Sequence, residues 1–400
     1  MSSDSRRTRT VLPYNVLVWL AVALFSTGID GYVLTGLLPT IATSLHVGDA
    51  AAGQLVTVFA LTSAIGAPLL GAVTSGWEQR RSILLALAVF VAGNLVTALA
   101  PTYAIALAGR IVAALGACLL AATISGYVIH VAPEHQRGRA LSFVLGGWMT
   151  ATALGVPVGL MLGQSSWRLP LIMVAAVGSV AFVGILVKLP RLRLAHRTIR
   201  ERIRPLRQPR LVAGLLVTTG ILCASYTCFT YSVLILERSL GSGWVIVLVM
   251  FGYGLASMLG NMVSGGLADR YPPGRVLTLT LLGLLCVGVV GVVAFALPAG
   301  PNVAVLGLIW FLAAGIGNGG AAVPQQARLA AMAPHSASVV MALNGSAISL
   351  GAALGGALGG LALTAGVRPG GLPIVAVAVL VATLALHVSV AVVERPAGCR

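Results

Sequence analysis

Long, continuously apolar segments follow one another along the chain, separated by short polar or Pro/Gly-rich turns. An apolar segment of about twenty residues is long enough to cross the ~30 Å hydrocarbon core of a membrane as a helix. The segments are too long, and too uniformly apolar, for the alternating strands of a β-barrel. The pattern predicts twelve membrane-spanning helices, at residues 14–38, 50–74, 82–100, 102–124, 139–163, 168–188, 211–236, 243–267, 275–297, 301–324, 337–364 and 371–393.

The composition agrees, because 58% of the 400 residues are hydrophobic and 8% are charged, whereas a soluble domain has roughly a quarter charged residues. A net charge of +16 could indicate a nucleic-acid partner. However, 21 of the 25 lysines and arginines fall in tails and loops on the same face of the membrane as the N-terminus. That is the positive-inside distribution. We therefore expect no nucleic-acid partner, a multi-pass protein of a bacterial inner (plasma) membrane, and both termini in the cytoplasm.

A basic segment at residues 189–210 divides the predicted helices into six and six. An internal repeat supports this division, because residues 71–81 and 265–275 have similar sequences and each runs from the end of an even-numbered helix to the start of the next. Two parallel six-helix repeats are typical of transporters with a central cavity that opens alternately to each side. The basic segment itself is interpreted as an orientation determinant on anionic lipid, with a regulatory partner as the alternative. The predicted parts are a cytoplasmic tail (1–13), a six-helix bundle (14–188), a basic linker (189–210), a second six-helix bundle (211–393) and a tail (394–400).

Several segments carry a resemblance to a known family. They include F-S-T-G-I-D-G-Y-V-L-T-G-L-L-P-T-I-A in the first span and A-A-G-Q-L-V-T-V-F-A-L-T-S-A-I-G-A-P-L-L in the second. Over essentially the whole chain, the sequence resembles the major facilitator superfamily, and within it the twelve-helix bacterial drug:proton antiporter branch. The resemblance implies an all-α membrane protein with two pseudo-symmetric bundles, and an acidic residue in the first span at the place of Asp30.

The loop signature G-x-x-x-D-R-x-x-x-G-R of this family is intact in the second half only. There it is formed by Gly265, Asp269, Arg270, Gly274 and Arg275. In the first half, Gly71, Arg80 and Arg81 match it, but Ser75 stands at the aspartate position. The resemblance implies a gating loop with a charge latch; the alternative is that these arginines only anchor helix ends on the cytoplasmic side.

The fifth span resembles the antiporter motif of the family through Gly155, Pro157 and Gly159. Val156 intervenes between the first glycine and the proline, so the match is displaced by one residue. Glycines spaced by four also make generic packing faces between membrane helices, and both interpretations stay open.

Asp30 is the one acidic residue, and Arg110 the one basic residue, that the sequence places in the interior of a predicted span. At 1.5 Å per residue, each lies about 12 Å below the outer end of its span, so we expect them to meet. Arg110 also falls in a segment, G-R-I-V-A-A-L-G, that resembles a motif of the family's fourth helix. Burial favours the neutral form of a carboxyl group and a nearby cation favours its charged form. The pair is therefore a candidate proton switch; the alternatives are a static structural ion pair and a polar residue without a coupling role.

The predicted function is export of a small amphipathic, drug-like compound in exchange for protons. The alternatives are a proton-coupled exporter of a sugar or other metabolite and, less favoured, a membrane sensor that transports nothing. We expect a monomer that is not an enzyme, has no cofactor and no metal, and whose partners are protons, a small-molecule substrate and the lipid bilayer. The candidate cavity residues, each of which could instead be a packing residue, are Tyr32, Tyr226, Phe229, Tyr231, Asn318 and Asn344.

Overall fold

The computed structural model describes residues 14–74, 76–132, 136–192, 204–241, 243–298 and 300–394, and all of its regular elements are helical. Eleven helices in this part of the chain are long and apolar enough to cross a membrane. The elements of the first half are α1 (Tyr14–Val33), η1 (Leu34–Leu37), α2 (Leu38–Ser44), α3 (Asp49–Val73), α4 (Gln79–Ala98), α5 (Tyr103–Val131), α6 (Arg137–Thr150), η3 (Ala151–Gly155), α7 (Val156–Gly163) and α8 (Arg168–Lys188).

The second half has the same plan of long helices joined by short turns. Its elements are η4 (Arg204–Arg207), α10 (Pro209–Phe229), α11 (Ser232–Leu240), α12 (Trp244–Arg270), α13 (Pro273–Ala296), α14 (Pro301–Met332), η5 (Pro334–Ser336), α15 (Ala337–Thr364), η6 (Pro369–Gly371) and α16 (Leu372–Glu394). Both predicted tails and most of the predicted basic linker lie outside the described residues, so these boundaries stay predictions.

Three predicted spans are interrupted in the structure. The first continues beyond residue 38 through η1 and α2 to Ser44, and the seventh is divided into α10 and α11. The fifth, predicted at 139–163, consists of α6, a π-helical turn η3, and α7. A π turn accommodates one additional residue in an α-helix. It ends at Gly155, where the resemblance to the antiporter motif is displaced by one residue.

Glycines let the fifth span lie directly against α1. A Cβ atom on Gly155 would stand 2.3 Å from Ile29, and one on Gly147 would stand 2.2 Å from the carbonyl oxygen of Ala21. Because real Cβ atoms essentially never approach so closely, a larger residue at Gly147 would push the two backbones apart, and one at Gly155 would displace the Ile29 side chain. The glycines of the predicted motif therefore pack α7 and η3 on α1.

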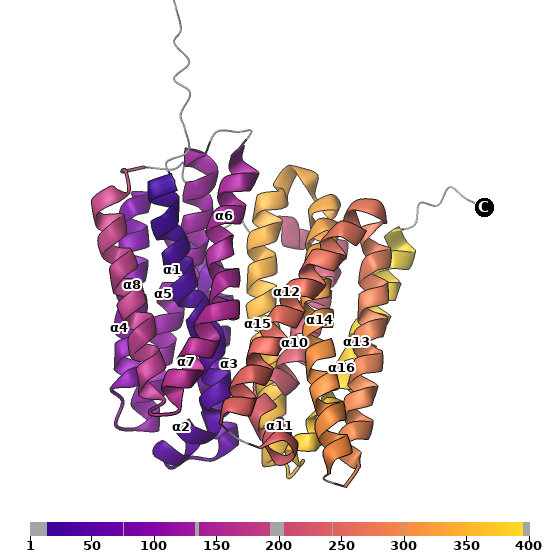
Figure 1. Cartoon of the computed structure of the whole chain (residues 1–400). Helices are drawn as coiled ribbons and strands as arrows, with labels where there is room; N and C mark the ends of the chain where they lie inside the picture. The colour runs from indigo at the N-terminus through magenta and orange to yellow at the C-terminus, as the bar shows by residue number, and fades with distance from the viewer. Residues whose placement is uncertain are drawn as a thin grey trace, which may run out of the picture.

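The helices of each half pack mainly on one another, and the two halves lie side by side (Figure 1). In the first half, α1 packs on α6 and α8, and α4 packs on α5 and α8. In the second, α10 packs on α15 and α16, and α14 packs on α12 and α13. The most extensive contact between halves joins α3 to α15, and α11 also contacts α2. In Figure 1, α2 and α11 mark the lower end of the molecule.

The contact between α3 and α15 is made by small residues near the α2–α11 end. Ala60 clusters with Ala352 and Ala353, and a Cβ on Gly356 would lie 2.5 Å from the Thr57 hydroxyl. No ion pair joins the two halves within the described ranges, since those found there link Asp30 to Arg110 and Glu78 to Arg81 and to Arg191 of the linker. The described residues of the two halves therefore meet here through small apolar residues and uncharged polar groups.

The prediction that Arg110 is the one cation inside a span is wrong. The predicted tenth span ends at residue 324, but α14 continues to Met332 and buries Arg328. Its Nη1 lies 2.6 Å from Nδ1 of His387, whose Nε2 lies 2.9 Å from the Thr278 hydroxyl. Because a guanidinium only donates, Nδ1 accepts and Nε2 carries the proton. Thr278 in turn donates to the carbonyl of Gly274 at 2.9 Å, so this chain of bonds ties α14, α16 and α13 together.

Candidate functional site

The first part of the site is a fully buried ion pair in the first half. Nη1 of Arg110 lies 2.6 Å from Oδ1 of Asp30, and both residues are 1% exposed. α1 supplies the aspartate and α5 the arginine. The contact expected from the shared depth of the two residues is present. A buried charge is stable in a membrane only with a partner, and here each of the two residues is the partner of the other.

Other groups around the pair leave part of the aspartate unsatisfied. The guanidinium of Arg110 lies 4.2 Å from the ring centre of Phe59, and its Nε donates to the carbonyl of Leu55 at 3.4 Å. Asn94 of α4 lies beside the Asp30 carboxyl group, and its Nδ2 donates to the carbonyl of Phe90. Oδ2 of Asp30 and Oδ1 of Asn94 are buried acceptors to which no residue in the described part of the chain makes a well-formed hydrogen bond. A proton on Asp30 would supply one.

The second part of the site is a cavity of about 290 Å³ between the two halves. Small-molecule sites in proteins have volumes of about 300–1,000 Å³, so the cavity suits a small organic compound. First-half residues from α1, η1, α6 and α7 and second-half residues from α10, α12, α14 and α15 line it. Asp30 and Arg110 are not among the lining residues, although Tyr32, two positions after Asp30 on α1, is.

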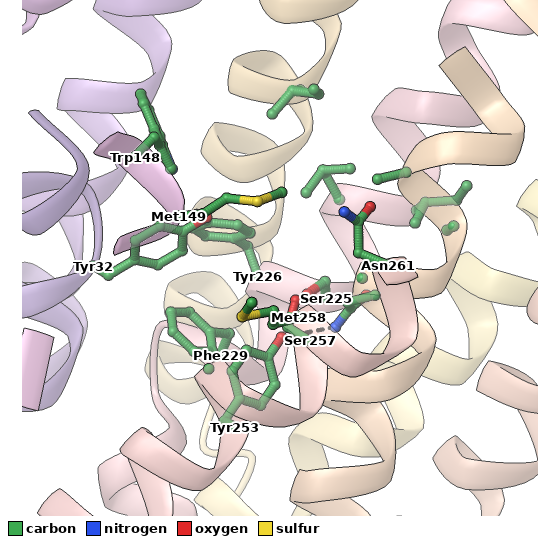
Figure 2. A pocket seen from close by; sticks show the side chains of 18 of the residues that line it. Tyr32, Trp148, Met149, Ser225, Tyr226, Phe229, Tyr253, Ser257, Met258 and Asn261 are labelled. Atoms are coloured by element: carbon green, nitrogen blue, oxygen red, sulfur yellow. Dashed lines mark hydrogen bonds between the residues drawn. The ribbon is translucent and has the colours of Figure 1, made fainter. Parts of the chain in front are cut away.

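Aromatic rings form one wall of the cavity. Phe229 lies at their centre, with ring-centroid distances of 5.9 Å to Tyr32, 5.7 Å to Tyr226 and 4.9 Å to Tyr253. Figure 2 shows Tyr32 and Trp148 entering from first-half helices, opposite Tyr226, Phe229 and Tyr253 from the second half. Apolar rings with polar tips at Tyr32, Tyr226 and Tyr253 give a wall that accommodates an amphipathic ligand.

Amides and hydroxyls line another part of the cavity. Gln325 donates from Nε2 to the carbonyl of Gly214 at 2.7 Å and to the Thr218 hydroxyl at 2.9 Å. Thr218 donates onward to Oδ1 of Asn344 at 2.8 Å. On another helix pair, Asn318 donates to the Tyr253 hydroxyl at 2.9 Å. α14 supplies both Gln325 and Asn318.

Five of the six predicted cavity residues line the cavity: Tyr32, Tyr226, Phe229, Asn318 and Asn344. Tyr231 does not. The helix break between α10 and α11 turns it toward the contact between the halves, where its hydroxyl donates to the carbonyl of Gly356 at 3.0 Å. A Cβ on Gly53 of α3 would lie 2.3 Å from this hydroxyl, so Tyr231 fills the space beside that glycine.

Sequence reasoning missed several lining residues. Thr218, Ser225, Tyr253, Asn261 and Gln325 were not singled out, although uncharged polar residues inside apolar spans were the available signal. Tyr253 and Asn261 are two turns apart on α12, which places them along the same side of that helix.

The two signature loops differ in their ion pairs. In the described part of the chain, Asp269, Arg270 and Arg275 take part in none, so the expected second-half latch is not formed in this state. In the first half, where Ser75 replaces the signature aspartate, Arg81 pairs with Glu78 at 3.3 Å. Arg80 donates to the carbonyl of Leu186 at the end of α8. Ser75 lies outside the described residues.

Two bundles of membrane helices around a central cavity, with a buried ion pair beside it, define a membrane transporter as a class. The family model described as Major Facilitator Superfamily matches residues 20–355 and, a second time, residues 215–398. The chain therefore belongs to the Major Facilitator Superfamily, and it is a multi-pass membrane transporter.

Relatives and solved structures agree with this assignment. The chain is 29% identical to the "Inner membrane transport protein YdhP" of Escherichia coli (strain K12), over 92% of this chain and 94% of that protein. It is 33% identical to the "Chloramphenicol resistance protein" of Streptomyces lividans, over 64% of this chain and 67% of that protein. The fold resembles a D-xylose-proton symporter with a TM-score of 0.75, at 15% identity, covering 94% and 97% of the two chains.

Proposed function

We propose that this transporter exports a small amphipathic organic compound, of the kind that includes antibiotics, in exchange for protons by alternating access. The observation that carries the proposal is the buried pair of Asp30 and Arg110 beside a cavity that both halves line. The name of the Streptomyces lividans relative supports a drug-like substrate.

Asp30 is the proposed proton carrier. When it is charged, Arg110 neutralises it; when it is protonated, it no longer attracts the guanidinium, and the contact between α1 and α5 weakens. Because α1 also supplies Tyr32 to the cavity, a change at Asp30 reaches the substrate through the same helix. Proton and substrate thus act on one element without sharing one binding site.

The orientation gives a substrate access from the cytoplasm, as export requires. Under the positive-inside rule the end at which α1 begins faces the bacterial cytoplasm, and the α2–α11 end faces outward. The contact between α3 and α15 then closes the outer end in this state. Met149 and Met258, which line the cavity, are 49% and 46% exposed, so the cavity is not sealed from its surroundings. The cavity would therefore load from the cytoplasm.

The test is efflux of a panel of antibiotics, dyes and sugars from cells that express the wild-type chain, Asp30→Asn or Asp30→Glu, each with and without a protonophore. We expect the wild type to lower the cellular accumulation of at least one compound. We expect Asp30→Asn to lose the component of efflux that the protonophore abolishes in the wild type. Asp30→Glu, which keeps a carboxyl group, should retain part of it. Gradient-dependent efflux by Asp30→Asn at the wild-type rate would rule out Asp30 as the coupling residue.

Export of a sugar or other metabolite is the second candidate. The amides and hydroxyls of Thr218, Asn318, Gln325 and Asn344 favour it, because neutral hydroxyl-rich compounds are recognised by such groups. The same panel separates the two candidates: efflux of sugars without efflux of ring compounds would favour this one. A chain that expresses normally but changes the accumulation of no compound would favour the membrane sensor.

A further inference from the structure

The described residues that line the cavity include no aspartate, glutamate, lysine, arginine or histidine. Asp30 and Arg110 neutralise each other outside the lining, and the buried cation Arg328, three positions after Gln325 on α14, also lies outside it and is bonded to His387. A charged ligand would therefore leave water without meeting an opposite charge, and an unpaired ion is strongly disfavoured in such surroundings. The lining thus selects against ions of either sign.

Aromatic rings could in principle hold a cation over their faces. Here the central ring, Phe229, already packs against other rings of the protein: it is tilted against Tyr253 at a centroid distance of 4.9 Å and stacked with Phe311 at 6.4 Å. Tyr253 also lies against Phe311, at 4.7 Å. The rings form a packed wall rather than a cage around a common centre, and such a wall suits a flat, apolar ring of the ligand.

Gln325 gives the cavity a polar requirement. It is 3% exposed, and both of its amide protons are used, one by Gly214 and one by Thr218. The carbonyl of Gly214 only accepts hydrogen bonds, so the orientation of the amide is fixed with its nitrogen toward that group. Its Oε1 is then a buried acceptor to which no described residue donates. A buried acceptor left in this way is costly unless a ligand supplies a donor.

We propose that the substrate is an uncharged compound that combines an aromatic ring with an N–H or O–H group, the ring resting on the wall around Phe229 and the donor bonding to Oε1 of Gln325. This proposal rests on the proposed export function and narrows its substrate class. Gln325 is a specificity-determining residue, because its Oε1 can accept a hydrogen bond from a donor on the substrate but carries no charge that would stabilise an ion.

The test is binding to the purified full-length chain in lipid nanodiscs, measured by calorimetry, so that its outcome does not depend on proton coupling. The probes are chloramphenicol, which is uncharged and carries a ring, an amide N–H and hydroxyls; its fully N- and O-methylated analogue; the cation tetraphenylphosphonium; and the anion 4-nitrobenzoate. We expect chloramphenicol to bind at least about tenfold more tightly than each of the other three.

Variants locate the effect. Gln325→Met removes the acceptor and should weaken chloramphenicol at least about tenfold while changing the methylated analogue little. The matched control is Gln208→Met, the same replacement at an exposed position before α10, which should bind as the wild type does. The comparison of the two uncharged probes on the wild-type chain needs no variant, so it stands even if Gln325→Met fails to fold.

Tighter binding of tetraphenylphosphonium or 4-nitrobenzoate than of chloramphenicol would overturn the proposal, as would equal binding of chloramphenicol and its methylated analogue. Failure of every uncharged probe to bind would also overturn it. None of these results bears on Asp30, whose role is tested by efflux; loss of coupling with intact selective binding would overturn the export mechanism alone.

Discussion

Removing the charges of Asp30 and Arg110 one at a time, and then together, separates a structural role from a coupling role. Each residue is 1% exposed and the pair distance is 2.6 Å. Breaking a buried pair by removing one partner costs about 3–5 kcal/mol, because the other charge is left uncompensated, whereas replacing both partners is often neutral or stabilising. Asp30→Asn should therefore be strongly destabilised, and Asp30→Asn/Arg110→Gln should recover most of the loss.

The magnitude can be checked against an ion-pair group in the same chain whose cations are exposed. Glu78, with a side chain that is 10% exposed, pairs with Arg81 at 3.3 Å and with Arg191 at 3.7 Å, and the two arginine side chains are 72% and 73% exposed; pairs screened by solvent in this way contribute about 0–1 kcal/mol. Glu78→Gln is thus the matched control, and it should melt within a few degrees of the wild type. Thermal unfolding in one detergent, followed by tryptophan fluorescence, compares all four variants with the wild type.

Transport assays on the same variants in proteoliposomes complete the experiment. If Asp30 carries the proton, the double variant folds and exchanges substrate for substrate but does not accumulate it against a gradient when a proton gradient is imposed. Accumulation by the double variant at the wild-type rate would refute the coupling role and leave a purely structural pair. Equal melting temperatures for both single variants, the double variant and the wild type would refute the energetic reasoning itself.

Three further predictions concern the rest of the molecule. Gly53→Ala brings a methyl group onto Tyr231 and should loosen the contact between the halves, so cysteines introduced at the α2–α11 end should be labelled faster. Adding Tyr231→Ala removes the clash and should restore slow labelling. Unchanged labelling in Gly53→Ala would contradict the assigned contact. Tyr226→Leu removes a ring from the cavity wall and should weaken binding of a ring compound about two- to tenfold in calorimetry; wild-type affinity would count against that wall. His387→Leu deprives Arg328 and Thr278 of a buried partner and should cost about 1–3 kcal/mol in thermal unfolding, whereas Ser389→Ala, on the exposed face of the same helix, should cost little.

The contact between Asp30 and Arg110 was predictable because the membrane makes an isolated charge so unfavourable. Two opposite charges in the interior of predicted spans, at one depth, leave few arrangements other than a pair. Eleven of the twelve predicted spans are long apolar helices in the described chain, and they were predictable for the same reason, since only such helices cross the bilayer; the fifth, divided into α6, η3 and α7, is not among them.

The features that could not be predicted from the sequence are the helix interruptions and the positions of helix ends. Hydropathy reports the length of an apolar run but not a π turn such as η3 or the break that turns Tyr231 away from the cavity. Arg328 was assigned to a loop because a cation near the end of an apolar run is normally an anchor. Its burial depends on His387, which is about sixty positions away in sequence and contacts it only in the folded bundle.

The charge-free cavity lining also determines how transport would respond to voltage. Under the proposed exchange, an uncharged molecule leaves while protons enter, so every proton exchanged carries one uncompensated positive charge into the cell. Each such charge is worth about 2.3 kcal/mol per 100 mV of membrane potential, equivalent to about a 50-fold concentration ratio at equilibrium. The membrane voltage alone would then drive export when the pH on the two sides is equal, and the transporter would generate a measurable electric current.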